Sequence, residues 1–262
     1  MRHDSDTLAS AAVADDWYTT FHSGLAAEFW RAAAATMAEA DTALIAGLLE
    51  PAGAAAEILD CPCGDGRIGH RLARCGHRVI AIDISAEEIK YARELARRDG
   101  LAVEHAVGDL RALPLDSAGV DAMVWWGNAF GYTSRADTPA TLAEARRVLR
   151  PGGVLLLETL TVAEAFLPGS FGSESEYAFG AITMRVRNAY RIRESRVDAE
   201  ATFTHADGRV EHRSFAHHVH TTAEVADLLE AAGFGELELL GPDGIEPFAL
   251  GDRRLIVRAR AA

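Results

Sequence analysis

The chain has 262 residues, of which 49% are hydrophobic and 25% are charged, values typical of a globular protein with a sizeable buried core. Its 39 acidic side chains outnumber its 26 basic ones and give a formal net charge of -13, which disfavours nucleic acids and anionic membrane surfaces as partners. The opening residues, MRHDSDTLAS, lack an apolar targeting segment, and no run of about 18 uncharged apolar residues follows. We therefore expect a cytoplasmic protein that binds neither nucleic acid nor membrane.

The alanine-rich residues 17–50 carry apolar side chains at helical spacing and contain no proline, a pattern that predicts two helices. From Glu57 the pattern changes to short apolar runs, EILDC and HRVIAID, which are separated by a helical stretch that begins at a glycine-rich turn. Beyond the second run, Ser85 and Glu88 predict a helix that starts with a reciprocal capping box. Residues 1–56 are thus predicted to form an N-terminal helical cap ahead of the first strand.

Further apolar runs, LAVEHAVGD, VDAMVWW and VLLLETL, predict strands three to five, with a helix at DTPATLAEARRVL before the fifth. TTAEVADLLEAAGF predicts a helix with a capping box from Thr221 and Glu224, and ELELLG and RRLIVRAR predict two closing strands. Strands that alternate with helices in this way imply a parallel sheet with helices on both faces. The predicted fold class is α/β, a Rossmann-like, mostly parallel sheet of seven strands formed by residues 57–169 and 221–262.

Residues 170–220 break this alternation. AITMRVRNAY and VDAEATFTH alternate polar and apolar side chains, and Asp207-Gly208 is a hairpin signal before RVEHRSFAHHVH. We expect an antiparallel β insertion after strand five, which acts as a lid or as a contact of a homo-oligomer formed through its strands.

The stretch ILDCPCGDGRIGHRLA contains the G-x-G-x-x-G pattern of dinucleotide sites, at Gly64, Gly66 and Gly69. In an open parallel sheet, ligands bind beyond the carboxyl ends of the strands, where carboxylates are also expected: Asp60, Asp83 and Asp109. Such carboxylates are hostile to a pyrophosphate and suit a ligand with hydroxyls, amines and a cation. Because the glycine pattern itself matches a dinucleotide site, an NAD-dependent oxidoreductase is kept as the alternative function.

The same stretch also holds two of the three cysteines, Cys61, Cys63 and Cys75. An odd number in a chain of this kind argues against a disulfide framework. The spacing Cys61-x-Cys63 lacks the two-residue gap and the second ligand pair of a zinc site. We expect small hydrophobic side chains there, and no metal.

The ordered motifs resemble those of class I S-adenosylmethionine-dependent methyltransferases. ILDCPCGDGRIGHRLA looks like their first motif, VIAIDIS like the second, VGDLRALP like the adenine-contacting segment, and RRVLRPGGVLLLE like the run into strand five. The sequence departs from the pattern at Pro62, where many members have the first glycine of the motif. The resemblance implies S-adenosylmethionine as cofactor and S-adenosylhomocysteine as its product.

The resemblance also implies which residues bind this cofactor. Its methionyl part is expected at Asp60, Cys61, Gly64 and Gly66, its ribose and adenine at Asp83 and Ile84, and the adenine edge at Asp109 and Leu110. Arg67 is expected to pair with the methionyl carboxylate, and Trp126 to offer its backbone carbonyl to the methionyl amine.

WWGNAFGYTS and the insertion resemble small-molecule methyltransferases, among them N-methyltransferases that tailor amino sugars and antibiotics. The implied function is methyl transfer to an amine, or to a hydroxyl, of a small metabolite, in secondary metabolism. Asn128, Phe130 and Tyr132 follow strand four beside the expected methyl position and are candidate catalytic residues, of which Asn128 is favoured. Packing of aromatic side chains in this loop is the alternative interpretation.

Two other regions offer candidates. The resemblance implies a cap that folds over the cofactor, where Tyr18 or Trp30 would close the pocket; aromatic side chains at helical spacing more commonly indicate core packing, and Tyr18, with its hydroxyl, is the favoured candidate. His217 is a candidate base for a phenol or alcohol, and a packed edge of the insertion explains it equally well. A metal site at the neighbouring His218 and His220 is only weakly indicated, because the two share one strand face without a nearby carboxylate or cysteine of matching phase. A protein that binds the cofactor without methylating remains a third hypothesis.

Overall fold

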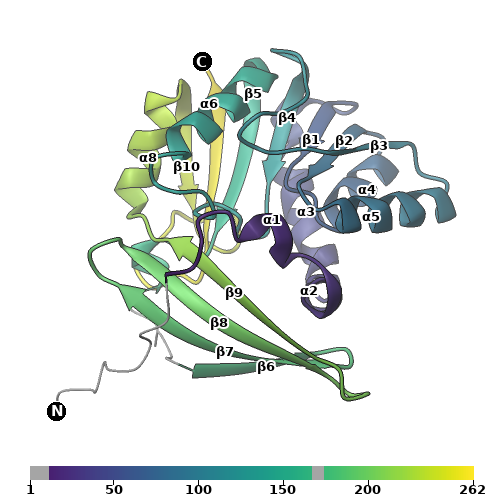
Figure 1. The fold of residues 1–262 in the computed structure, drawn as a ribbon. Coiled ribbons are helices and arrows are strands. Elements are labelled where there is room, and N and C mark those ends of the chain that lie inside the picture. The colour runs from purple at the N-terminus through teal and green to yellow at the C-terminus, as the bar shows by residue number, and fades with distance from the viewer. Residues whose placement is uncertain (1–11, 167–173) are drawn as a thin grey trace.

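The computed structural model describes residues 12–166 and 174–262, and Figure 1 shows their arrangement. The elements before β3 are α1 (Tyr18–Phe21), α2 (Gly24–Ala35), α3 (Ala38–Leu48), a 3-10 turn (Glu50–Ala52), β1 (Glu57–Asp60), α4 (Arg67–Arg74), β2 (Arg78–Asp83) and α5 (Ala86–Arg98). From there to the insertion they are β3 (Val103–Val107), β4 (Val120–Trp125), α6 (Thr138–Val148), β5 (Leu149–Thr159) and α7 (Ala163–Phe166). The remainder are β6 (Glu174–Phe179), β7 (Ile182–Arg191), β8 (Arg196–His205), β9 (Val210–His218), α8 (Thr222–Ala231), β10 (Phe234–Leu240) and β11 (Leu255–Ala261).

The main sheet has seven strands in the order β10-β11-β5-β4-β1-β2-β3. The pairs from β5 to β3 are parallel, whereas β11 runs antiparallel to both β5 and β10. Val154, Leu155, Leu156 and Leu157 of β5 have no exposed surface, as expected for a strand covered on both faces. The predicted fold class, a Rossmann-like and mostly parallel sheet, is confirmed.

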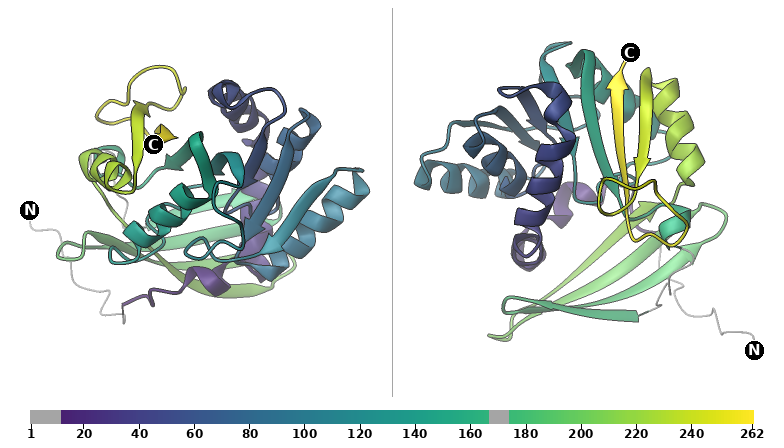
Figure 2. Two further views of the ribbon diagram at one scale, coloured as in Figure 1. Left: turned by 90° about the horizontal axis from the view of Figure 1, so that it is seen from above. Right: turned by 180° about the vertical axis from the view of Figure 1, so that it is seen from behind.

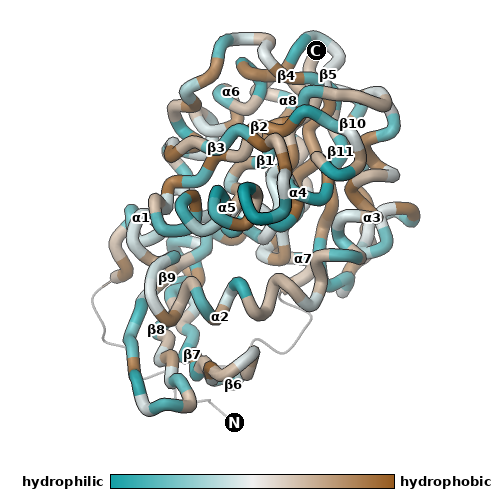
Figure 3. The backbone as a smooth tube through the Cα atoms, turned by 90° about the vertical axis from the view of Figure 1, so that its right-hand side faces the viewer, coloured by the Kyte–Doolittle hydropathy of each residue, from teal (hydrophilic) through white to brown (hydrophobic). Residues whose placement is uncertain are grey.

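Helices cover the sheet on both faces, as the two views in Figure 2 show. On one face, Ile45 of α3 and Leu72 of α4 pack with the side chains of β1 and β4 that point toward them. On the other face, Leu142 of α6 and Leu229 of α8 pack against the opposite set of side chains. Each strand thus contributes to two hydrophobic cores, which explains why the sequence shows continuous apolar runs rather than alternation. In Figure 3, hydrophilic residues alternate with hydrophobic ones along α4 and α5, as expected for helices with one face on the sheet.

The second sheet is antiparallel, in the order β6-β7-β8-β9, and lies beyond the carboxyl ends of the parallel strands (Figure 1). The turn between β8 and β9 follows the predicted Asp207-Gly208 signal, with Gly208 at a φ of 95°. Side chains of α1 and α2 pack on this sheet, where Phe29 of α2 meets Phe203 of β8 at 5.4 Å between ring centroids. The cap and the insertion therefore share one hydrophobic core.

Several expected details are wrong. The alanine-rich segment forms three helices rather than two, because extended backbone at Ser23 and the positive φ of Gly24 separate α1 from α2. The insertion gains a strand, β6, whose alternation was not recognised; the expected residues 170–173 lie outside the described residues. Ser85 caps α5, but Glu88 pairs with Arg31 of α2 instead of returning to the cap. The second capping box, at Thr221, is complete.

Cys61, Cys63 and Cys75 are free thiols, and the first two are buried. Within residues 12–166 and 174–262, no group of three or more His, Cys, Asp or Glu side chains is arranged to hold a metal ion. In the same ranges, no helix has the length and apolar character needed to span a bilayer.

The shared core of cap and insertion predicts the cost of removing its central side chain. Phe203 is fully buried between Phe21 and Phe29, so Phe203→Ala should lower the free energy of unfolding by about 3–5 kcal/mol in urea denaturation. Tyr177→Ala, on the exposed side of β6, is the control and should change it by less than about 0.5 kcal/mol. Equal, small effects of the two substitutions would show that α2 does not share a core with this sheet.

Candidate functional site

The glycine turn joins β1 to α4 at the carboxyl edge of the sheet. Gly66 has a φ of 77°, the left-handed conformation in which a side chain is strained, and a Cβ there would lie 2.7 Å from Nε2 of His70. At Gly69, a Cβ would meet Oδ2 of Asp60 at 3.0 Å. The spacing of these glycines is thus needed for the turn itself and for close contact between α4 and the end of β1.

Asp60 lies 1% exposed beneath this turn. Its Oδ2 accepts a hydrogen bond from the Gly69 N–H at 2.9 Å. Burial raises the pKa of Asp60 to about 7, against the opposing effects of that N–H and of the nearby Arg67 guanidinium. Near neutral pH this carboxyl group is therefore partly protonated, and a charge placed beside it would shift that equilibrium.

Asp83, at the end of β2, fastens the turn to the next strand. One of its carboxylate oxygens accepts from the Gly64 N–H and the other from the Ser85 N–H, both at 2.8 Å. The Ser85 hydroxyl in turn donates to the carbonyl of His22 at 2.8 Å, which ties the end of α1 to the start of α5. Ile84, between these residues, packs against the cap. Asp83 thus connects the glycine turn, α5 and the cap.

The carboxylate of Asp109, which is expected to contact the adenine edge, already has a partner within the chain. The Arg111 guanidinium forms an ion pair with it at 2.7 Å, and the Arg111 N–H donates to its Oδ1 at 2.8 Å. This guanidinium holds the pKa of Asp109 below its usual range. The same guanidinium lies 5.7 Å from the ring centroid of Tyr18, which brings the cap to this edge of the site. Leu110, between the pair, packs against the core.

Asn128 is held at three sides. It has a φ of 61°, a conformation that asparagine tolerates better than most residues, and its N–H donates to Glu158 at the end of β5 at 2.8 Å. Its Oδ1 accepts from the Leu160 N–H at 2.8 Å. Its Nδ2 lies 3.4 Å from Nε2 of His217 on β9. The side chain therefore joins the ends of β4 and β5 to the second sheet.

Aromatic and imidazole rings surround His217. Tyr132 lies 4.9 Å from His217 and 6.4 Å from His22, measured between ring centroids, and Trp17 lies 4.7 Å from Tyr132. Burial lowers the pKa of His217 to about 4 and raises that of Tyr132. Since the Asn128 amide donates to Nε2, the neutral imidazole carries its proton on Nδ1. Tyr18 completes the cluster, with its ring stacked 6.4 Å from Tyr132.

Other candidate residues lie elsewhere. Phe130 is 2% exposed and packs against Trp125 in the core rather than facing an acceptor, because its loop turns inward after β4. Trp30 is 38% exposed on α2, where its ring meets that of Phe29 edge-on, and it is not among the buried aromatic side chains of the cap core. The Cys61 side chain is buried in the core, and burial raises the pKa of its thiol. Only the backbone of Cys61 therefore lies at the turn.

Trp126 is also buried, in the core on the α3 side, beneath the Arg254 guanidinium. Of the two neighbouring histidines, His218 is the last residue of β9, whereas His220 lies beyond the strand and forms an isolated β-bridge with Val162. A ring contact at 5.4 Å places His220 against Phe130. These histidines therefore belong to the packing around β9.

Sequence reasoning missed three residues of this site, Arg111, Glu158 and His22. Glu158 was detectable, because it is a charged residue at the end of an otherwise apolar strand, and its carboxylate receives the N–H groups of Gly127 and Asn128. Burial raises its pKa. His22 and Arg111 carried no comparable signal, since only tertiary contacts place them beside Tyr132 and Asp109.

Comparison with known proteins bears on this arrangement. Residues 58–153, which contain the glycine turn and the ends of β1 to β4, match the family model described as a methyltransferase domain. Residues 58–153 are similar to a methyltransferase domain. The resemblance inferred from the motifs is thereby confirmed. Among curated proteins, the malonyl-[acyl-carrier protein] O-methyltransferase of Erwinia pyrifoliae is 38% identical over 141 residues, which are 52% of this chain and 51% of that protein. The chain thus matches about half the length of this relative.

Solved structures share the methyltransferase fold over most of the chain. An S-adenosylmethionine-dependent methyltransferase from Clostridium acetobutylicum has a TM-score of 0.75 at 16% identity, covering 84% of this chain and 89% of the other. CalS10, described as an amino pentose methyltransferase from Micromonospora echinaspora involved in calicheamicin biosynthesis, has a TM-score of 0.64 at 22% identity, covering 85% and 90%. At these identities the likeness establishes the fold of the methyltransferase domain and its additions.

The raised pKa of Asp60 predicts a pH effect on stability. Between about pH 4 and pH 7 the folded protein keeps the proton that the unfolded chain has lost, so this carboxyl group lowers the free energy of unfolding as the pH rises. Asp60→Asn retains an acceptor for Gly69 and removes the titration. From pH 5 to pH 7, the variant should gain about 1–3 kcal/mol relative to the wild type in urea denaturation.

Asp207→Asn is the control for this measurement, because Asp207 is exposed in the hairpin and its pKa is lowered to about 2. Its stability should follow the wild-type pH dependence between pH 5 and pH 7. If Asp60→Asn also runs parallel to the wild type, Asp60 titrates normally in the folded protein.

Proposed function

We propose that the protein is an S-adenosylmethionine-dependent methyltransferase that transfers a methyl group to an amine or a hydroxyl of a small metabolite. The observation that carries this proposal is the glycine turn of a methyltransferase domain, fastened from below by Asp60 and Asp83 at the ends of adjacent strands. A carboxylate pair in this position suits a cationic ligand and opposes a pyrophosphate.

The residues around the turn fit the methionyl part of the cofactor. Nε of Arg67 is buried and makes no hydrogen bond to any described residue, and a Cβ placed on Gly127 would lie 3.6 Å from its Nη2. This guanidinium is proposed to receive the methionyl carboxylate. Asp60 is proposed to hold the methionyl ammonium, whose positive charge would favour the ionised form of a carboxyl group that titrates near neutrality.

Asp83 remains the proposed partner of the ribose hydroxyls. Each of its oxygens already accepts one backbone N–H, and a carboxylate oxygen has a second lone pair for a further donor. At the adenine end, Ile84 and Leu110 offer apolar contacts. Asp109 can serve the adenine amine only with an oxygen that it shares with Arg111.

When bound, S-adenosylmethionine supplies an activated methyl group at a sulfonium, so the chain mainly has to orient the acceptor and exclude water. Asn128 and His217 are proposed to do the first, through an amide held by Leu160 and an imidazole whose Nε2 lone pair points to that amide. A neutral imidazole can accept the proton that an amine or hydroxyl loses during transfer, and His217 would do so at Nε2 once the acceptor has displaced the Asn128 amide from that lone pair. Tyr18 and Tyr132 are proposed to exclude water from above.

The nature of the acceptor is proposed from what the relatives are called. The Erwinia protein is named an O-methyltransferase, whereas CalS10 is an amino pentose methyltransferase involved in the biosynthesis of a natural product. The neutral His217 is compatible with either acceptor atom. We keep an amine as the first candidate, a hydroxyl as the second, and secondary metabolism as the setting.

The insertion is proposed to act as a lid over the acceptor. His217 of β9 reaches the loop after β4, and the cap that packs on the same sheet reaches α5 through His22 and Ser85. This places the second sheet and the cap together over the carboxyl edge of the main sheet (Figure 1). Self-association through the strands of the insertion is the alternative role.

Cofactor binding tests the proposal directly. By calorimetry, the wild-type protein should bind S-adenosylhomocysteine with micromolar affinity and should not bind NADH. Asp83→Ala should weaken this binding at least tenfold, as expected for the loss of a charged hydrogen bond of about 1.5–3 kcal/mol. Asp227→Ala makes the same charge change at an exposed position of α8 and should leave the affinity unaltered.

Binding of NADH instead, or unchanged affinity in Asp83→Ala, would contradict the assignment of the cofactor. If S-adenosylhomocysteine binds but labelled S-adenosylmethionine methylates none of a panel of amines and phenols, the protein is a cofactor-binding relative that does not methylate.

The position of Asn128 predicts an effect on turnover. Asn128→Asp keeps the acceptor for Leu160 and tolerates a positive φ, but it removes the amide donor to His217. With an acceptor that the wild type methylates, this variant should lower kcat about tenfold or more while the affinity for S-adenosylhomocysteine changes less than about threefold. A large loss of cofactor affinity with unchanged kcat would place Asn128 in the cofactor site instead.

A further inference from the structure

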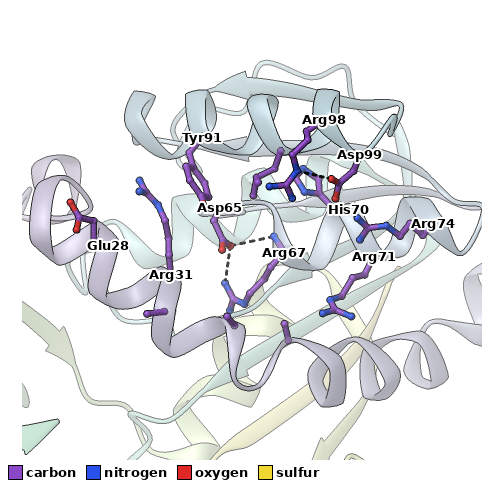
Figure 4. A pocket seen from close by; sticks show the side chains of 14 residues that line it. Glu28, Arg31, Asp65, Arg67, His70, Arg71, Arg74, Tyr91, Arg98 and Asp99 are labelled. Carbon is purple, nitrogen blue, oxygen red and sulfur yellow. Dashed lines mark hydrogen bonds and ion pairs between the residues drawn. The ribbon is translucent and has the colours of Figure 1, made fainter. Parts of the chain in front are cut away.

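A cavity of about 700 Å³ lies on the outer side of the glycine turn, between α2 and the pair α4 and α5. Figure 4 shows its lining, to which side chains from all three helices contribute. The volume lies within the range of small-molecule sites in proteins. The residues that line it contain five arginines and three acidic side chains, in a chain whose net charge is -13.

The positive charge is concentrated at one end of this groove. Arg31 is paired with Glu87 and Glu88, and Arg67 lies 3.6 Å from Asp65. At the other end, Arg74 and Arg98 share a single carboxylate, that of Asp99, at 2.6 and 2.9 Å.

Arg71 adds to the charge at this end. Within the described residues its guanidinium makes no hydrogen bond or ion pair. Two guanidinium groups, those of Arg74 and Arg98, therefore share one carboxylate, and that of Arg71, in the same lining, has no acidic partner among the described residues. Arg67, Arg71 and Arg74 follow one another at helical spacing along α4, so their charges repel unless an anion lies between them (Figure 4).

A second cavity adjoins this end. It measures about 300 Å³ and is lined by Arg71, Arg74 and Cys75 together with four residues of α3, Glu39, Thr42, Ala43 and Ala46. The two arginines are thus shared by both cavities, with charged walls on one side and mainly small, apolar side chains on the other. A ligand that fits this surface carries an oxyanion for the arginines and a short apolar chain for α3.

We propose that the groove between α3, α4 and α5 binds an organic oxyanion, a phosphate or carboxylate that carries a short apolar chain, with Arg71 and Arg74 holding the anionic group. Arg67, which is proposed to receive the methionyl carboxylate, lines the same cavity, but Arg71 and Arg74 follow it one and two turns further along α4 and have no role in the proposed cofactor site. Binding of the oxyanion at Arg71 and Arg74 does not depend on methyl transfer.

Calorimetry of the full-length chain at low ionic strength tests the site, with butyl phosphate as the probe for the organic phosphate and butyrate for the carboxylate. At least one of them should bind, and more tightly than inorganic phosphate, because the apolar chain adds contact with α3. Arg71→Gln should weaken this binding at least tenfold and leave the affinity for S-adenosylhomocysteine unaltered.

Arg97→Gln is the matched control, because Arg97 is exposed on α5, lines neither cavity and makes the same change in net charge. It should leave the binding of both probes unaltered. Equal losses in the two variants would mean that the probes respond to net charge alone and would overturn the site. Failure of both probes to bind the wild type, or their displacement by S-adenosylhomocysteine, would overturn it as well.

Discussion

Two carboxylates hold the backbone of one glycine turn against the sheet. The arrangement of residues at the carboxyl ends of the parallel strands depends on this connection. Asp60 receives the N–H of Gly69 from within α4, while Asp83 receives the N–H groups of Gly64 and Ser85. Because these acceptors are buried or nearly so, the N–H groups they satisfy would otherwise be costly. The turn is therefore fixed in a shape that leaves its outer side available to a ligand.

The burial that fixes the turn also sets the chemistry of the site. Asp60 is held close to its titration point, with a pKa of about 7, whereas His217 is kept neutral with a pKa of about 4. Both shifts have the same cause, because a low-dielectric environment disfavours the charged form of either group. One region thus has a carboxyl group that can meet a cation, and another has an uncharged base beside Asn128.

The cap and the insertion are linked through a core of their own, around Phe29 and Phe203. Their connections to the main domain include two hydrogen bonds, Ser85 to His22 and Asn128 to His217, and the ring contacts that Tyr132 makes with the cap. The two additions are thus joined to each other by an apolar core and to the main domain by both polar and aromatic contacts.

The sequence by itself determined the α/β class, the seven-stranded sheet and the positions of Asp60 and Asp83, because apolar runs, glycine spacing and strand-end carboxylates are local signals. Tertiary structure alone decided that Arg111 forms an ion pair with Asp109 and that Trp30 is partly exposed. It also decided that His22 and His217, almost two hundred residues apart, share the surroundings of Tyr132. These outcomes depend on contacts between distant segments, and no periodicity within either segment encodes which partner it meets.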